Sequence, residues 1–185
     1  MAKEQVIDRG DVDDQLLGEA IKLDCGVCKN LYHGTSISVA QKIKDNAEIE
    51  IGPQVGYLGK GVYCYHLDVE ASRLWARKKY KGSQISVFAL EADLGNTFYV
   101  SQELIRIFQN RASELKQLKL DMGVKVGYVI EVFVKDVMMP ELKIEIHTVG
   151  RNYVVGGKTP RRPVLMYALR HKGMIKKADL YWEES

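Results

Sequence analysis

The order of apolar and polar residues predicts alternating helices and strands in the first half of the chain. Apolar side chains recur at helical spacing in some segments, while others are short runs rich in β-branched and aromatic residues. Helices are expected over residues 11–23, 37–46 and 69–80, and strands over residues 30–36, 62–66 and 84–94. The glycine-rich segment between the second helix and the second strand is expected to be a loop.

The second half of the chain contains more expected strands. The longest helical pattern covers residues 102–119, and β-rich stretches follow at residues 124–137, 142–149, 163–170 and 174–182. Because helices and strands alternate early and strands dominate late, the sequence predicts an α+β fold. We expect a mixed β-sheet core with flanking helices.

Length and composition limit the class of protein. A chain of 185 residues, 46% of them hydrophobic, fits one globular domain with a short appendage, and no apolar run approaches the roughly 20 residues of a membrane span. The N-terminus lacks an apolar signal segment, and three cysteines are too few for a disulfide scaffold. We therefore expect a cytoplasmic protein with no membrane partner. Cys25 and Cys28 form a lone CxxC without further ligands nearby, so no metal site is expected.

Charge is distributed unevenly along the chain. Residues 1–24 contain seven acids against three bases, whereas residues 146–178 contain eight Lys or Arg and no acid. The basic stretch from Arg151 to Lys177 is expected either to contact the phosphates of a nucleic acid or cofactor, or to be an ordinary solvated edge.

The first local pattern with candidate chemistry is His33-Gly34-Thr35, at the end of an expected strand. Glycine lets a flat ligand approach the main chain closely, and the imidazole and hydroxyl supply polar groups beside it. The structural alternative is a histidine that is simply hydrogen-bonded within the fold. The common dinucleotide-loop, phosphate-loop, zinc-protease and serine-hydrolase motifs are absent from the sequence.

The second pattern is a glycine-rich run, Gly59-Lys-Gly-Val-Tyr63, followed by a helix that carries Ser72 and Trp75 three residues apart. Aromatic side chains from neighbouring elements can sandwich a planar ring, particularly a cationic one. The alternative is that Tyr63 and Trp75 are core aromatics.

Together, in this order and spacing, the two patterns resemble the ADP-ribosyltransferase superfamily, in the branch shared by diphtheria-toxin-like enzymes and poly(ADP-ribose) polymerases. The resemblance covers about residues 30–100 and includes the strand and turn at residues 89–96. It implies a single ADP-ribosyltransferase-like catalytic domain over residues 30–185, with an insertion near residues 101–125, preceded by a helical extension over residues 1–29.

The resemblance implies that NAD is the substrate. His33 would bond the adenosine-side ribose, Thr35 would contact ribose, and the main chain of Gly34, helped by Ser72, would hold the nicotinamide carboxamide. A stacked aromatic pair would hold the nicotinamide ring: it consists of Tyr63 and, in place of a second stacking tyrosine, Trp75. Breaking the nicotinamide–ribose bond builds positive charge on the ribose, which a nearby carboxylate would stabilise.

Two registrations of the sequence on the family's late strands give different answers for that carboxylate. In the first, Glu131 begins the strand and completes a catalytic set with His33 and Tyr63. In the second, Met166 stands at the acid's position. The chain would then be inactive, restricted to single transfers, or served by an acid from another segment, such as Glu141 or Glu145.

The expected function is that of an NAD-dependent mono-ADP-ribosyltransferase. It would cleave the nicotinamide–ribose bond and transfer ADP-ribose to a macromolecular acceptor, either protein or nucleic acid. The alternatives are a catalytically inactive module that binds NAD or ADP-ribose, and an NAD glycohydrolase. All of them require the strands of His33 and Tyr63 to lie side by side and to share one cleft.

Overall fold

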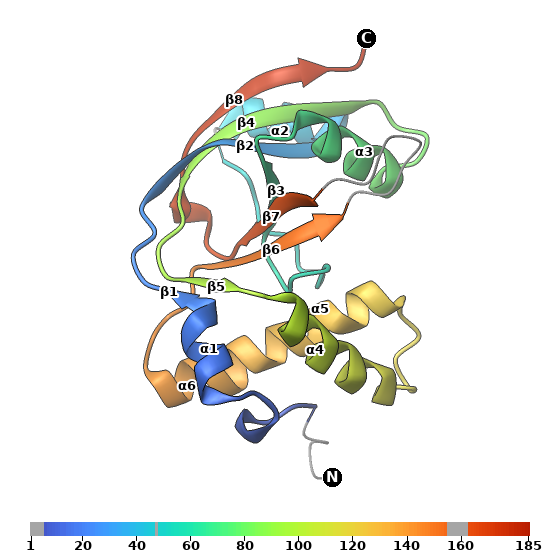
Figure 1. Ribbon diagram of the computed structural model, residues 1–185. Coiled ribbons are helices and arrows are strands. Elements are labelled where there is room, and N and C mark those ends of the chain that lie inside the picture. The colour runs from blue at the N-terminus through green and yellow to red at the C-terminus, as the bar shows by residue number, and fades with distance from the viewer. Residues whose placement is uncertain (1–5, 47, 155–162) are drawn as a thin grey trace.

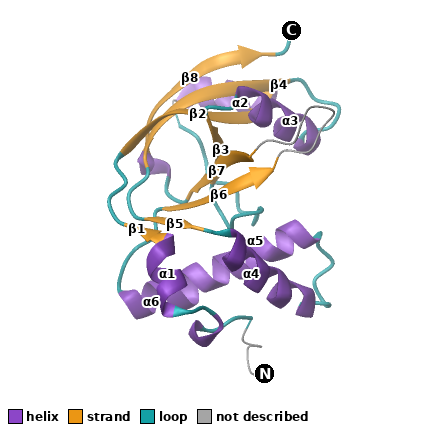
Figure 2. Ribbon diagram, viewed as in Figure 1, coloured by secondary structure: helices purple, strands orange, loops and turns teal. Residues whose placement is uncertain are grey.

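The computed structural model describes residues 6–46, 48–154 and 163–185 of the chain. These residues form one eight-stranded sheet with helices packed against it (Figures 1 and 2). The strands are β1 (Ile21–Lys22), β2 (Val27–Ser36), β3 (Val62–His66), β4 (Ile85–Asp93), β5 (Thr97–Tyr99), β6 (Thr148–Val154), β7 (Pro163–Leu169) and β8 (Ile175–Glu183).

The helices gather at two places beside the sheet. They are α1 (Asp14–Ala20), α2 (Ile37–Asn46), α3 (Val69–Lys79), α4 (Gln102–Glu114), α5 (Met122–Val132) and α6 (Met139–Leu142). Helices α2 and α3 lie near β2 and β4, whereas α1, α4, α5 and α6 form a layer beside β5 (Figure 1). No described helix is both long and apolar enough to cross a membrane.

The sheet is mixed, with the strand order β1-β5-β6-β7-β3-β2-β4-β8. Strands β5 and β6 are parallel, and all other neighbouring strands are antiparallel. Strand β3 lies between β2 and β7, so Tyr32 of β2 is opposite Tyr65 and Met166 of β7 is opposite Tyr65 on the other side. The strands that carry His33 and Tyr63 are therefore direct neighbours.

Two apolar clusters hold the molecule together. The larger one lies between the sheet and the helical layer, where Phe98, Phe108 and Phe133 are fully buried and contact one another. The smaller one lies under α2, where Ala40 and Ile43 pack on β2, β3 and β4. Burial of this apolar surface supplies the main driving force for folding.

The predicted α+β class agrees with the structure, and most of the predicted elements are present. Helix α3 and strands β3, β4, β7 and β8 lie where the sequence pattern places them. The helix predicted over residues 11–23 is shorter, because strand β1 begins at Ile21. The helix predicted over residues 102–119 ends at Glu114, and the strand predicted over residues 142–149 begins only at Thr148.

The prediction of a β-rich stretch over residues 124–137 is wrong. Helix α5 and a π-helical turn, Phe133–Met138, occupy it, and Asp121 caps the helix by accepting a hydrogen bond from the Val124 N–H at 3.1 Å. The sequence of α5 is apolar on nearly every side and shows no clear helical period. Burial of Val126, Val129 and Ile130 against the core overrides the preference of valine for strands, which depends strongly on context.

The first described residues pack into the larger cluster. Ile7, Val12 and Leu17 are buried there, and Ile21 of β1 pairs with Phe98 of β5. The region predicted as an N-terminal extension is therefore in close contact with the sheet and with the helical layer.

Candidate functional site

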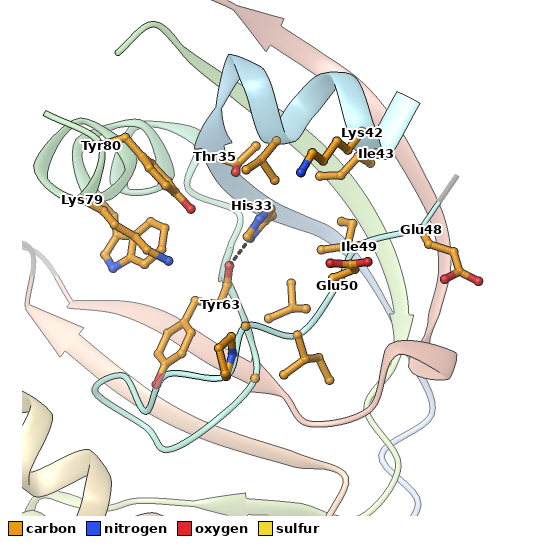
Figure 3. Close-up of a pocket in the computed structure, with 17 residues that line it drawn as sticks. His33, Thr35, Lys42, Ile43, Glu48, Ile49, Glu50, Tyr63, Lys79 and Tyr80 are labelled. Atoms are coloured by element: carbon orange, nitrogen blue, oxygen red, sulfur yellow. Dashed lines mark hydrogen bonds between the residues drawn. The ribbon is translucent and has the colours of Figure 1, made fainter. Parts of the chain in front are cut away.

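A cavity of about 360 Å³ opens where β2 and β3 meet α3 (Figure 3). His33 and Thr35 line it from β2, Tyr63 from β3 and Trp75 from α3. Residues that are distant in the sequence but were predicted to act together thus surround one space. This cavity is called the His33 cavity below.

His33 is held in one orientation by its neighbouring strand. Its Nδ1 lies 2.7 Å from the carbonyl oxygen of Tyr63, and the side chain is buried (Figure 3). Burial, aided by the charge of nearby Lys79, lowers the pKa of His33 to about 4, although the hydrogen bond to Tyr63 opposes this. The neutral ring donates its Nδ1 proton to the carbonyl, so Nε2 keeps a lone pair that can accept a hydrogen bond.

The Tyr63 side chain is fixed at both its hydroxyl and its ring. The hydroxyl donates to the Gly59 carbonyl at 2.7 Å and accepts from the Leu58 N–H at 2.6 Å. The ring lies nearly parallel to that of Trp75, with the centroids 6.2 Å apart and the planes at 11°. A third ring with contacts of about 3.5 Å on both faces needs about 7 Å. A small increase in the distance between the two rings would therefore admit a flat ligand.

Unpaired cations lie beside the aromatic pair. The ammonium of Lys79 is 4.7 Å from the centre of the Trp75 ring, and Lys42 lines the His33 cavity from α2. Neither lysine has an acid within 4 Å in the described part of the chain. These charges can attract the phosphates of a nucleotide.

Gly34 lies where α3 packs directly on β2. A Cβ atom at this position would be 2.3 Å from the carbonyl oxygen of Ser72, so the close approach of helix and strand requires glycine. The hydroxyls of Thr35 and Ser72 are fully buried and have no hydrogen-bond partner among residues 6–46, 48–154 and 163–185. An unpaired buried hydroxyl costs free energy. Thr35 belongs to the wall of the His33 cavity, but protein atoms cover its hydroxyl.

A second cavity, of about 200 Å³, adjoins the first. Tyr63, Trp75 and Lys79 line both, and Tyr57 lines the far side of the second. The aromatic pair thus lies between two connected spaces, large enough together for a ligand that extends on both sides of a stacked ring.

Glu131 is not at the start of a strand, contrary to the pattern that suggested it as the acid. It lies on α5, and its carboxylate accepts two hydrogen bonds from Arg170, at 2.7 and 3.0 Å, and one from the Lys60 N–H at 2.9 Å. Burial raises the pKa of Glu131, but the hydrogen bonds from Arg170 and Lys60 outweigh it and hold that pKa below its usual range. Glu131 does not line the His33 cavity.

The Glu131–Arg170 ion pair supports the loop that holds Tyr63. Both side chains are nearly buried, with 12% and 10% of their surface exposed, and Glu131 reaches the loop at Lys60. Gly59, next to Lys60, has a φ of +87° and accepts the Tyr63 hydroxyl. The Glu131 carboxylate therefore holds this loop in place.

The second registration requires late strands, which the structure contains as β7 and β8. Met166 on β7 is fully buried, so it presents no group to the His33 cavity. The other acids considered also lie elsewhere: Glu141 pairs with Arg9, and Glu145 contacts two histidines.

The sequence patterns missed a carboxylate that does line the His33 cavity. Glu48 and Glu50, in the segment predicted only as a loop, both belong to its wall. Glu48 forms an ion pair with Lys172, whereas Glu50 has no cation within 4 Å in the described ranges. In Figure 3 the Glu48 carboxylate points away from His33, and Glu50 is an exposed residue of the cavity wall.

Three bases of the stretch from Arg151 to Lys177 form ion pairs. Arg170 is bound to Glu131, Lys172 to Glu48 and Lys177 to Asp179. Three further bases of the stretch lie outside the described residues: Lys158, Arg161 and Arg162.

No protein-family model, curated protein or solved structure matches this chain.

Proposed function

We propose that the chain is an ADP-ribosyltransferase-like protein that binds NAD in the His33 cavity and transfers ADP-ribose from it to a macromolecular acceptor. The observation that carries the proposal is one shared space bordered by a neutral imidazole and a parallel aromatic pair, His33 with Tyr63 and Trp75. These groups match the chemistry of a ribose hydroxyl and of a flat, cationic ring.

In the proposed complex, each part of NAD meets a group of suitable chemistry. A ribose hydroxyl donates to Nε2 of His33, and the nicotinamide ring enters between Tyr63 and Trp75. Lys79 lies beside that ring pair and balances the charge of the pyrophosphate. Thr35 lies in the wall of the same cavity, and its hydroxyl must be uncovered before it can bond the ligand.

The transfer breaks the bond between ribose C1′ and the nicotinamide nitrogen, and the bonding electrons leave with neutral nicotinamide. An acceptor nucleophile then forms a bond to C1′ and loses its proton to solvent. Positive charge develops on the ribose in between, and a nearby carboxylate stabilises it. The proposal assigns this role to Glu50, because it lines the cavity and has no cation within 4 Å among the described residues.

The direct test uses isothermal titration calorimetry with NAD, followed by incubation of the protein with labelled NAD and cell extract. We expect NAD to bind, and His33→Ala to weaken binding by roughly 1–3 kcal/mol. We expect Glu50→Gln to bind NAD normally but to release nicotinamide much more slowly. His171→Ala, an exposed histidine outside the cavity, is the matched control. Absence of NAD binding would overturn the proposal.

A module that binds NAD without reacting is the second candidate. The observation that favours it is the absence of the expected acid from the cavity, since Glu131 is bound to Arg170 and Met166 is apolar and buried. It predicts calorimetric binding without any nicotinamide release, for the wild-type chain as well as for Glu50→Gln.

A further inference from the structure

A third cavity, of about 210 Å³, continues the row formed by the first two. Tyr57 lines both the second cavity and the third, so the two adjoin. Arg151 and Tyr153 line the third cavity from β6, Gln109 from α4, and Asp121 at the start of α5. None of these five residues has a role in the proposed binding of NAD.

Tyr57 and Tyr153 form a second pair of nearly parallel rings. Their centroids are 6.5 Å apart and their planes differ by 11°, almost the geometry of the pair formed by Tyr63 and Trp75. Both tyrosines are half-buried, and both line the third cavity. Every nucleobase has a flat face that can stack on such rings.

Arg151 brings an unpaired positive charge to the same cavity. It is half-buried and has neither a hydrogen-bond acceptor nor an acid within ion-pair distance in the parts of the chain described. Removing an unpaired cation from water costs free energy. The backbone of Arg151 lies in β6, opposite the fully buried Met166 of β7. A partly desolvated guanidinium with free N–H donors suits a phosphate.

We propose that the third cavity binds one nucleotide of a single-stranded nucleic acid that is the acceptor for ADP-ribose. The base stacks on Tyr57 and Tyr153, and the phosphate contacts Arg151. Gln109 and Asp121 add an amide and a carboxylate, groups that hydrogen-bond base edges. The acceptor role rests on the proposed function, but the binding of nucleic acid does not.

The residues that line the third cavity favour a nucleic acid over a phosphorylated peptide as the ligand. Sites for phosphopeptides use clusters of arginine, whereas among the described residues Arg151 is the one arginine that lines this cavity. Single-stranded nucleic acids are bound by grooves in which aromatic side chains and cations follow one another. The three adjoining cavities have this character, from Lys79 and Trp75 through Tyr57 to Arg151.

The test measures fluorescence anisotropy of a short fluorescein-labelled oligouridylate titrated with the full chain. Arg151→Gln is expected to weaken binding by about tenfold or more, the loss of a charged hydrogen bond. It should also reduce the dependence on salt by about 0.7 in the log–log slope, the value for one lost phosphate contact with a single strand. Tyr153→Leu, which keeps apolar bulk on β6, is expected to weaken binding by about 5- to 150-fold.

The matched control is Arg77→Gln, the same change at an arginine of α3 that lines none of the three cavities and pairs only with Glu184. It should bind the oligonucleotide as the wild-type chain does. Thermal unfolding of each variant shows whether it is folded. Equal binding by Arg151→Gln and Arg77→Gln, or binding of a phosphotyrosine peptide in preference to the oligonucleotide, would overturn the proposal.

Calorimetry with NAD separates this proposal from the proposed function. Arg151→Gln is expected to bind NAD normally, whereas His33→Ala is expected to bind NAD more weakly and the oligonucleotide normally. If the wild-type chain binds the oligonucleotide but not NAD, the proposed function fails and the nucleotide site stands. If it binds NAD but not the oligonucleotide, the nucleotide site fails alone.

Discussion

At the scale of single residues, His33 shows how burial sets the chemistry of the site. An exposed histidine gains a proton near pH 6.5, but His33 is enclosed between strands and near Lys79, which keep its pKa at about 4. It stays neutral throughout the physiological range. A site in which His33 accepts a hydrogen bond therefore shows no pH dependence between pH 6 and 8 that arises from this residue.

The low pKa of His33 predicts a loss of stability in mild acid. As the pH falls from 6.5 toward 4, the unfolded chain takes up a proton on this residue before the folded chain does. Stability that is fully present above pH 6.5 is therefore lost toward pH 4, by about 3 kcal/mol at 1.36 kcal/mol per pKa unit. Urea unfolding at several pH values should show a smaller loss for His33→Gln. The exposed His171→Gln should retain the wild-type slope.

The hydroxyl of Tyr63 offers a second prediction at this scale. Tyr63→Phe leaves the Gly59 carbonyl and the Leu58 N–H without their partner in a buried place. We expect the free energy of unfolding to fall by about 1–3 kcal/mol, measured by urea unfolding. Tyr181→Phe, at a ring that is 56% exposed, should change it little. Equal effects would show that the Tyr63 hydroxyl does not hold the loop.

At the scale of elements, α5 and the loop over residues 56–60 form one unit. A Cβ atom at Gly127 of α5 would be 1.7 Å from the Gly56 carbonyl oxygen, and one at Gly56 would be 2.7 Å from the Tyr63 ring. Helix, loop and aromatic side chain are therefore packed in series. The ion pair between Glu131 and Arg170 closes the same unit from the side of β7.

This packing predicts opposite effects for the same substitution in two helices. Gly127→Ala should lower the free energy of unfolding by about 3 kcal/mol or more, because the loop must move. It should also weaken NAD binding, since the loop holds Tyr63. Gly18→Ala in α1 meets nothing within 4 Å. It should raise stability by roughly 0.5–1 kcal/mol. A tolerated Gly127→Ala in thermal unfolding would contradict the close contact.

The parts of the site that the sequence predicts are those whose signal is local. The strands of His33 and Tyr63 have short apolar runs and turn glycines next to them, and α3 has a capping aspartate, Asp68, which bonds the Ala71 N–H at 2.9 Å. The sequence of α5 predicts a strand because its apolar residues are distributed around the helix and lack the apolar–polar period that distinguishes a helix.

Long-range contacts explain what the sequence could not indicate. Glu131 meets a partner 39 residues away, and Lys172 meets Glu48 across 124 residues. Such ion pairs hold the candidate acid Glu131 next to a loop and give single bases of the basic stretch an acidic partner. The cavity role of Glu50 likewise depends on how a loop without regular structure folds back over β2.

At the scale of the whole molecule, the first described residues join the sheet to the helical layer. Leu17 is only 2% exposed and belongs to the larger apolar cluster. Leu17→Ala should lower the free energy of unfolding by about 2–5 kcal/mol, measured by urea unfolding. Leu23→Ala, at a side chain that is 61% exposed, should change it by less than about 0.5 kcal/mol. Equal values would show that this segment is only loosely attached.

The single parallel pair of strands, β5 and β6, has a consequence for the order of events in folding. Parallel neighbours cannot be joined by a tight turn, and here the connection between them contains α4, α5 and α6. Residues of β6 and β7 pair over a much shorter separation, from Val154 with Pro163 to Thr148 with Leu169, than Thr97 of β5 with Thr148 of β6. Pulse-labelling hydrogen exchange should find amide protons between β6 and β7 protected early, and those between β5 and β6 only in the slow phase.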